Sequence, residues 1–137
     1  MICLVTGGRS FTDRLFVYER LDEARAALGI TELVHGGATG ADTLAKDWAV
    51  SRGVVHHPEP VDEESWQRLG GRAGNARNSF MLRKWSPGVV IGFPGGTGTT
   101  DMVVKGRAAK IPVLMTWSSR WAELLAETAQ KLAPEHW

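Results

Sequence analysis

The chain has 137 residues, of which 43% are hydrophobic and 23% charged, and its formal net charge is +1. This length fits one domain spanning residues 1–137, with a composition ordinary for a globular protein. The near-zero net charge gives no bulk attraction to nucleic acid or to a membrane surface, so neither is an expected partner.

The only cysteine, Cys3, lies in an apolar run and leaves no internal disulfide to form. The chain starts directly on that run, without a basic segment or a long apolar stretch, so we expect a cytoplasmic protein without signal peptide or membrane span. The adjacent His56 and His57 lack the spacing of a helical metal site. We expect no metal and no cofactor.

Five apolar, β-branched runs follow one another along the chain and predict short strands. They are ICLVT (2–6), ELVH (32–35), GVVHH (53–57), GVVIGF (88–93) and PVLMT (112–116). Helical patterns separate them at 14–28, 41–52, 75–85 and 99–109, and another closes the chain at 118–132. Gly29 and Gly53 stand where the first two helices should stop, as left-handed caps.

The segment HHPEPVDEESWQRLGGR (56–72) interrupts this alternation. Its two prolines and paired glycines predict a loop or flap with about one helical turn. Trp66 lies in this loop, where it is placed to stack on a base or to close over a crevice.

Strands that alternate with helices predict an α/β protein with a five-stranded, mainly parallel sheet and helices on both faces. For the strand order we predict 3-2-1-4-5. The ligand crevice of such a sheet opens between strands 1 and 4, where the order reverses.

Three of the strand-to-helix turns contain glycines: TGGRSFTD (6–13), HGGATGAD (35–42) and FPGGTGTTD (93–101). The first and third should face each other across the crevice. Glycine permits close backbone approach, and a helix N-terminus offers free N–H groups to an anion, so these turns suit a phosphate. The alternative is that the glycines only make tight turns. Neither the P-loop nor the GxGxxG fingerprint fits.

Four blocks, LVTGGRSFTD, HGGATGAD, AGNARNSFM and FPGGTGTT, together resemble the SLOG superfamily, which unites DprA/Smf-like proteins with the LOG nucleotide hydrolases. The similarity is greatest to its small, stand-alone YspA/YpsA-related branch. This resemblance implies a Rossmann-like, three-layer α/β/α fold that binds nucleotides or nucleotide-derived ligands.

The LOG hydrolases cleave the N-glycosidic bond of nucleoside 5′-monophosphates, using an arginine in RKxxM and a glutamate in PGGxGTxxE. In this chain, Arg77 matches the arginine, but Met102 stands at the glutamate position. Asp101 is the neighbouring acid, although one helical residue turns its side chain by about 100°. We therefore take Arg77 and Asp101 as the candidate catalytic residues.

Several further residues should contact the ligand. Arg9 and Arg77 match phosphate oxygens with their forked guanidinium groups, Asp42 suits either a ribose hydroxyl or a helix cap, and Asn78 suits a base edge or a helix turn. The candidate ligand-binding residues are Gly7, Gly8, Arg9, Gly36, Gly37, Asp42, Arg77, Asn78, Gly95, Gly96, Thr97, Gly98 and Thr99.

Two functions follow from these residues. The first is a sensing or binding module for a nucleotide or nucleotide-derived small molecule, and the second is a LOG-like nucleoside 5′-monophosphate phosphoribohydrolase. We prefer the first because the usual catalytic glutamate is absent. The resemblance implies pairing through helices, as relatives often pair in this way, and tryptophan-rich helical surface is costly to leave in water, so we also expect a homodimer or larger homo-oligomer.

Overall fold

The computed structural model describes residues 1–133. Its elements are β1 (Ile2–Thr6), α1 (Arg14–Leu28), β2 (Glu32–His35), α2 (Ala41–Arg52), β3 (Val55–Pro58), α3 (Glu63–Leu69), α4 (Arg72–Trp85), β4 (Val89–Gly92), α5 (Thr97–Ala108), β5 (Val113–Met115) and α6 (Trp121–Leu132). The five strands form one parallel sheet in the order β3-β2-β1-β4-β5, which confirms the predicted α/β architecture and strand order.

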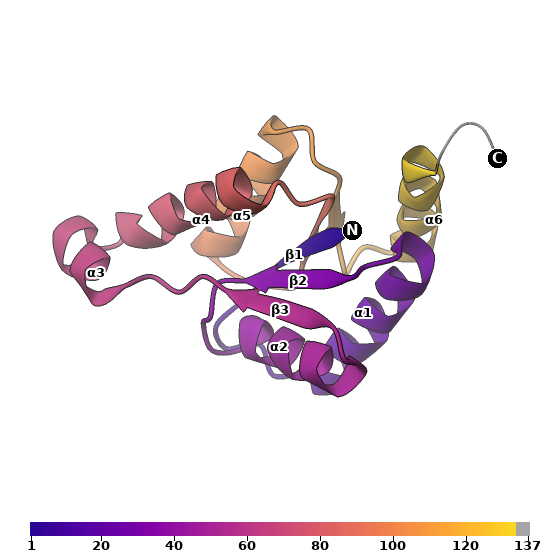
Figure 1. Cartoon of the computed structure of the whole chain (residues 1–137), viewed down its shortest axis with the longest axis horizontal. Helices are drawn as coiled ribbons and strands as arrows, with labels where there is room; N and C mark the ends of the chain where they lie inside the picture. The colour runs from indigo at the N-terminus through magenta and orange to yellow at the C-terminus, as the bar shows by residue number, and fades with distance from the viewer. Residues whose placement is uncertain (134–137) are drawn as a thin grey trace.

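The side chains of β1 alternate between two apolar layers, because successive residues of a strand point to opposite faces. Cys3 and Val5 belong to a core shared with α1, α2 and α6, while Leu4 belongs to a second core with Met81 of α4 and Met102 of α5. Figure 1 shows the two groups of helices on either side of the sheet. The sheet is therefore covered on both faces, as expected from its near-continuous apolar strands.

Glycines end the first two helices as predicted. Gly29 and Gly53 both adopt the left-handed conformation, with φ of 71° and 69°, and the Gly29 N–H donates to the carbonyl oxygen of Arg25 at 2.9 Å. Both helices have the predicted bounds.

The segment expected as a loop holds more helix than its sequence suggested. α3 fills Glu63–Leu69, and α4 starts at Arg72, three residues before the predicted start at residue 75. Asp62 caps α3, because its Oδ1 accepts a hydrogen bond from the Ser65 N–H at 2.6 Å. None of the residues of α3 is buried, and the helix stands at one end of the molecule, beyond the sheet (Figure 1).

In residues 1–133, no helix has both the length and the apolar composition that crossing a membrane requires.

Candidate functional site

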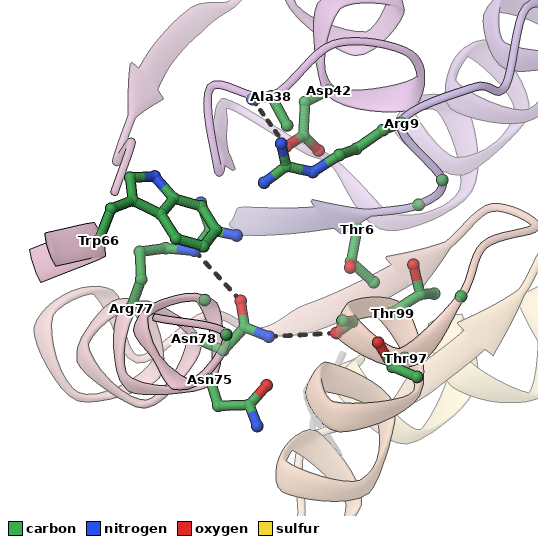
Figure 2. Close-up of a pocket in the computed structure, with 16 residues that line it drawn as sticks. Thr6, Arg9, Ala38, Asp42, Trp66, Asn75, Arg77, Asn78, Thr97 and Thr99 are labelled. Carbon is green, nitrogen blue, oxygen red and sulfur yellow. Dashed lines mark hydrogen bonds between the residues drawn. The ribbon is translucent and has the colours of Figure 1, made fainter. Parts of the chain in front are cut away.

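A cavity of about 410 Å³ opens at the carboxyl edge of the sheet, between the turn after β1, the start of α2, and the first turns of α4 and α5 (Figure 2). Its wall combines backbone, hydroxyl, amide, guanidinium and carboxylate groups with one indole ring. The lining residues are Thr6, Gly7, Gly8, Arg9, Ala38, Asp42, Trp66, Gly71, Gly74, Asn75, Arg77, Asn78, Gly96, Thr97, Gly98 and Thr99.

The fold gathers most of the candidate site residues at this cavity. Those in its wall are Gly7, Gly8, Arg9, Asp42, Arg77, Asn78, Gly96, Thr97, Gly98 and Thr99. Gly36, Gly37, Gly95 and Asp101 are not among the lining residues. Sequence reasoning missed Thr6, Ala38, Gly71, Gly74 and Asn75 as wall residues. Gly71, Gly74 and Asn75 lie in GGRAGNARN, so a glycine-rich signal was present for these three.

The glycine turns after β1 and β4 touch directly, whereas we expected them to face each other across the crevice. The Gly8 N–H donates to the Pro94 carbonyl oxygen at 2.8 Å. A Cβ at Gly8 would lie 2.8 Å from that oxygen, and a Cβ at Gly95 would lie 2.7 Å from the Gly8 nitrogen. Close packing of two backbones is thus sufficient to explain Gly8 and Gly95.

The glycines at the start of α5 differ, because open space lies in front of them. A Cβ at Gly96 or Gly98 would meet no atom of residues 1–133 within 4 Å, and the φ of Gly96 is negative, at −101°. Both line the cavity. Within residues 1–133, no contact explains why these positions are glycine.

The first turn of α5 also leaves its donors unused. Its N-cap is Gly96, which has no side chain to cap the helix. Among the described residues, the N–H groups of Thr97, Gly98 and Thr99 donate no hydrogen bond. Such groups, together with the helix dipole, form an anion-binding arrangement.

The start of α4 resembles that of α5. Gly71 is its N-cap and has no side chain to cap the helix, and open space lies in front of both Gly71 and Gly74. By contrast, no residue of α1 lines the cavity, and this helix is capped by Asp13, whose Oδ1 accepts from the Phe16 N–H at 3.1 Å. α6 lacks a side-chain cap as well, so missing caps alone do not define the cavity.

Most of the Arg77 guanidinium is occupied by hydrogen bonds within the protein. Its Nη1 donates to the carbonyl oxygens of Gly36 at 2.7 Å and Glu59 at 3.2 Å, and its Nε donates to Asn78 Oδ1 at 3.2 Å. Burial lowers the pKa of the guanidinium, although nearby Asp42 opposes that effect. Gly36 is explained by the same contact, because a Cβ there would collide with the guanidinium. The Nη2 group is the part of the fork left for a ligand.

Asn78 links α4 to α5. Its Nδ2 donates to the Gly98 carbonyl oxygen at 3.1 Å and to Asp101 Oδ2 at 3.0 Å, as the dashed line to α5 in Figure 2 shows for the first of these. Since its Oδ1 accepts from Arg77, both ends of the amide are occupied. The helix-contact interpretation of Asn78 is therefore the better supported one.

Asp101 is held on the α4 side of α5. Its Oδ2 accepts from Asn78 and forms an ion pair with Lys105 Nζ at 2.9 Å. Met102, at the glutamate position of the hydrolases, is 0% exposed and packs among Leu4 and Met81. Neither position presents a side chain to the cavity.

Asp42 is the one carboxylate among the lining residues described. It lies in the first turn of α2, is 6% exposed, and its Oδ2 accepts from the Ala38 N–H at 3.2 Å. Burial raises the pKa of this carboxyl to about 6, although the Ala38 N–H, Arg77 and Arg9 each lower it. A cavity carboxylate with a pKa near neutrality is a frequent mark of a functional site.

Arg9 and Trp66 form the outer part of the wall. The Arg9 Cζ atom lies 5.7 Å from the centroid of the Trp66 ring, and Figure 2 shows the guanidinium extending toward the indole. Gly37, by comparison, has a φ of 68° and donates its N–H to His35 Nδ1 at 3.0 Å, so a turn explains it.

The three histidines near this edge pair with neighbouring side chains. His35 Nε2 lies 3.2 Å from His56 Nδ1, while His57 stacks on Trp85 with ring centroids 4.2 Å apart. Burial lowers the pKa of His35 to about 4, which favours a neutral ring. Within residues 1–133 no group of three or more histidine, cysteine, aspartate or glutamate side chains is arranged to hold a metal.

Solved structures of similar fold include TM1055, a structural-genomics target, with a TM-score of 0.62, 19% identity, and coverage of 82% of this chain and 72% of that one. DNA processing protein A (DprA) from Streptococcus pneumoniae gives a TM-score of 0.63 and 15% identity over 96% of this chain and 56% of its own. The molybdenum cofactor carrier protein MCP from Chlamydomonas reinhardtii gives a TM-score of 0.59 and 21% identity over 96% of this chain and 86% of its own. These similarities establish the shared fold.

Sequence comparison is more specific. Gene 61 protein of Mycobacterium phage D29 is 37% identical over 118 residues, which make up 81% of this chain and 92% of that protein. The sequence profile of the YspA, cpYpsA-related SLOG family matches residues 1–65. The chain belongs to the YspA, cpYpsA-related SLOG family.

Proposed function

We propose that the cavity binds a nucleotide or nucleotide-derived phosphate ligand and that the protein acts as a binding or sensing module. The observation that carries this proposal is the open first turn of α5. Gly96 and Gly98 have open space where a side chain would stand, and the N–H groups of Thr97 to Thr99 donate to nothing in residues 1–133. Glycine and free donors at one helix N-terminus suit the close approach of a phosphate.

Charge and volume support the same ligand. Arg9 lines the cavity, and none of its guanidinium N–H groups donates a hydrogen bond within the described chain, so it is available to phosphate oxygens. A volume of about 410 Å³ lies in the range of small-molecule sites. Asp42, across the cavity from α5 in Figure 2, is suited to accept hydrogen bonds from ribose hydroxyls.

Isothermal titration calorimetry with the four common nucleoside 5′-monophosphates tests this proposal. Arg9→Ala should weaken binding by about 1.5–3 kcal/mol, the range for a hydrogen bond to a charged group. Arg83→Ala is the matched control, because Arg83 is an exposed arginine in the last turn of α4 and does not line the cavity. Arg77 is a poorer test, since its removal also breaks contacts to two main-chain carbonyls.

Gly96→Val is a second variant for the same calorimetry experiment. Its Cβ would meet no atom of residues 1–133 within 4 Å, and Gly96 lines the cavity, so binding should be lost while thermal unfolding stays close to the wild type. Equal affinity of wild type and Gly96→Val for every nucleotide that binds would contradict a phosphate at the first turn of α5.

One observation favours a second candidate, hydrolysis of nucleoside 5′-monophosphates. With Met102 in the core and Asp101 paired to Lys105, Asp42 is the cavity carboxylate suited to take a proton from water. Water would attack C1′, the C1′–N bond would break with its electron pair on the base nitrogen, and Asp42 would accept the proton that the base then takes up.

Release of free base from the four nucleotides, measured by chromatography, separates the two candidates. Asp42→Asn should abolish any release and keep the fold, because the amide avoids the cost of a buried charge. Release that survives this substitution would show that Asp42 is not the reacting carboxylate, and no release by the wild type leaves binding as the function.

Assembly into a homodimer or larger homo-oligomer and weak affinity for nucleic acid stay predictions. Light scattering at micromolar concentration tests the first. A steep loss of DNA binding with added salt would be the signature of phosphate contacts and would contradict the second.

A further inference from the structure

Trp66 and Arg9 meet at the mouth of the cavity, although they come from distant parts of the chain. Arg9 follows the glycine turn after β1, and Trp66 lies on α3. Their contact is a cation–π pair with 5.7 Å between the Arg9 Cζ atom and the ring centroid (Figure 2).

The fold does not need a tryptophan at this position. Trp66 is 37% exposed, on a helix that has no buried residue. Trp48, in contrast, is 0% exposed and donates from Nε1 to Asp22 Oδ1 at 2.8 Å. Trp66 therefore presents a large aromatic face to the cavity and contributes little to the core.

The Arg9 side chain has two alternative partners, the Trp66 ring and an anion at the first turn of α5. The backbone of Arg9 is anchored beside the α5 turn, because the preceding residue, Gly8, donates its N–H to the Pro94 carbonyl oxygen at 2.8 Å. Its side chain reaches Trp66 instead, and a partly exposed cation–π contact is weak in water. An anion at the first turn of α5 would offer the guanidinium a stronger, charge-assisted partner.

The spacing of the pair decides how an aromatic ligand would enter. A planar ring between guanidinium and indole would need about 7 Å, twice the ~3.5 Å contact distance between carbon atoms. The observed 5.7 Å leaves no room for it. On the face of the indole that Arg9 covers, a base can stack on Trp66 only where Arg9 now lies.

We propose that a ligand with both an aromatic base and a phosphate exchanges both partners of the Trp66–Arg9 pair. The phosphate takes Arg9 to the α5 turn, and the base takes its place on the Trp66 ring. This inference rests on the proposed phosphate site, and it adds that the base contributes directly to affinity. A sugar phosphate without a base can satisfy Arg9 but leaves the Trp66 face bare.

Calorimetry with the four nucleoside 5′-monophosphates and with ribose 5-phosphate tests the exchange. At least one nucleotide should bind wild type about 10-fold more tightly than ribose 5-phosphate, in line with the measured worth of base–aromatic stacking. Trp66→Ala should remove most of that difference and leave the affinity for ribose 5-phosphate within about twofold of wild type. Trp66→Phe should retain part of it.

Trp117→Ala is the matched control, because Trp117 is 50% exposed and does not line this cavity. Equal binding of ribose 5-phosphate and every nucleotide by wild type would overturn this inference alone, as would equal weakening of both ligand classes by Trp66→Ala. Failure of all the phosphates to bind would overturn the proposed function, and this inference with it.

Discussion

The beginning of α5 has a packed side and an open side. On the packed side, a Cβ at Gly95 would lie 2.7 Å from the Gly8 nitrogen, and Met102 is 0% exposed in an apolar core. On the open side, nothing lies within 4 Å of a Cβ at Gly96 or Gly98. Neighbouring glycines of one motif thus have different causes. Packing explains the first, and no contact within residues 1–133 explains the other two.

The largest expected effect is on the packed side, with Met102→Glu. A carboxylate there would be buried beside Leu4 and Met81 without a partner. An unpaired buried charge falls among the most disruptive changes, so we expect a loss of about 4 kcal/mol or more in the free energy of unfolding. Urea denaturation measures it, and installing the hydrolase glutamate should yield no activity.

Met102→Leu is the control for that change, because it nearly conserves volume and should cost less than about 1.5 kcal/mol. If Met102→Glu instead folds as stably as Met102→Leu and releases base, α5 can rotate its glutamate into the cavity. The division of α5 into two sides would then be wrong.

Alanine at two adjacent glycines tests the division directly. Gly95→Ala should cost about 1–3 kcal/mol, because the new Cβ collides with the Gly8 backbone and the Thr99 hydroxyl. Gly96→Ala should leave the free energy of unfolding within about 0.5 kcal/mol of wild type, the range for substitutions away from packed features. Equal costs for the two variants would contradict an open side. The midpoints of urea denaturation of both variants and the wild type, measured under the same conditions, test this difference.

Asp42→Asn should stabilise the chain at neutral pH by about 1–2 kcal/mol, since it removes a buried charge. The pKa of this carboxyl is raised by burial from 3.8 to about 6 in the folded state. The folded state therefore binds this proton more tightly, so the contribution of Asp42 to wild-type stability is greatest below pH 3.8 and falls as pH rises toward 6.

The advantage of the asparagine variant should accordingly be absent near pH 3.5, develop across the pH 4–6 window, and stay constant above it. Denaturation of wild type and variant in a series of buffers measures the difference. A constant difference across all pH values would show that Asp42 does not titrate in that window.

Gly98→Ala should produce the smallest change, a gain of about 0.5 kcal/mol, because alanine loses less backbone entropy than glycine in a helix. Its Cβ meets no protein atom within 4 Å. Thermal unfolding should therefore rise slightly while nucleotide affinity falls. A variant that binds as well as wild type would place the ligand away from Gly98.

The strands could be predicted because apolar runs and chain alternation are local signals of a parallel sheet, whereas their order rested on the right-handed crossovers typical of such sheets. α3 was predicted as only about one helical turn because its flanking prolines and glycines outweighed the capping signal of Asp62 before Glu63 and Glu64. The start of α4 was placed too late for the same reason, since Gly71 and Gly74 look like helix breakers in sequence.

The edge of the cavity could be predicted from the positions where strands end, but the direction of each side chain could not. Arg77 and Asn78 contact backbone carbonyls contributed by residues 20 or more positions away, such as Gly36 and Gly98. Asp101 turns toward Lys105 and Asn78. Such choices depend on which helix faces meet, and sequence spacing does not determine them.

The central strand β1 has consequences for the order of folding. β1 pairs with β2 on one edge, with Cys3 opposite Leu33, and with β4 on the other, with Cys3 opposite Val89. During synthesis, the β1–β2–β3 half is complete some thirty residues before β4 emerges. Until then the inner edge of β1, apolar and unpaired, is open to other chains. A fragment ending before β4 should therefore aggregate. In the complete chain, β4 pairs with this edge of β1 and protects it.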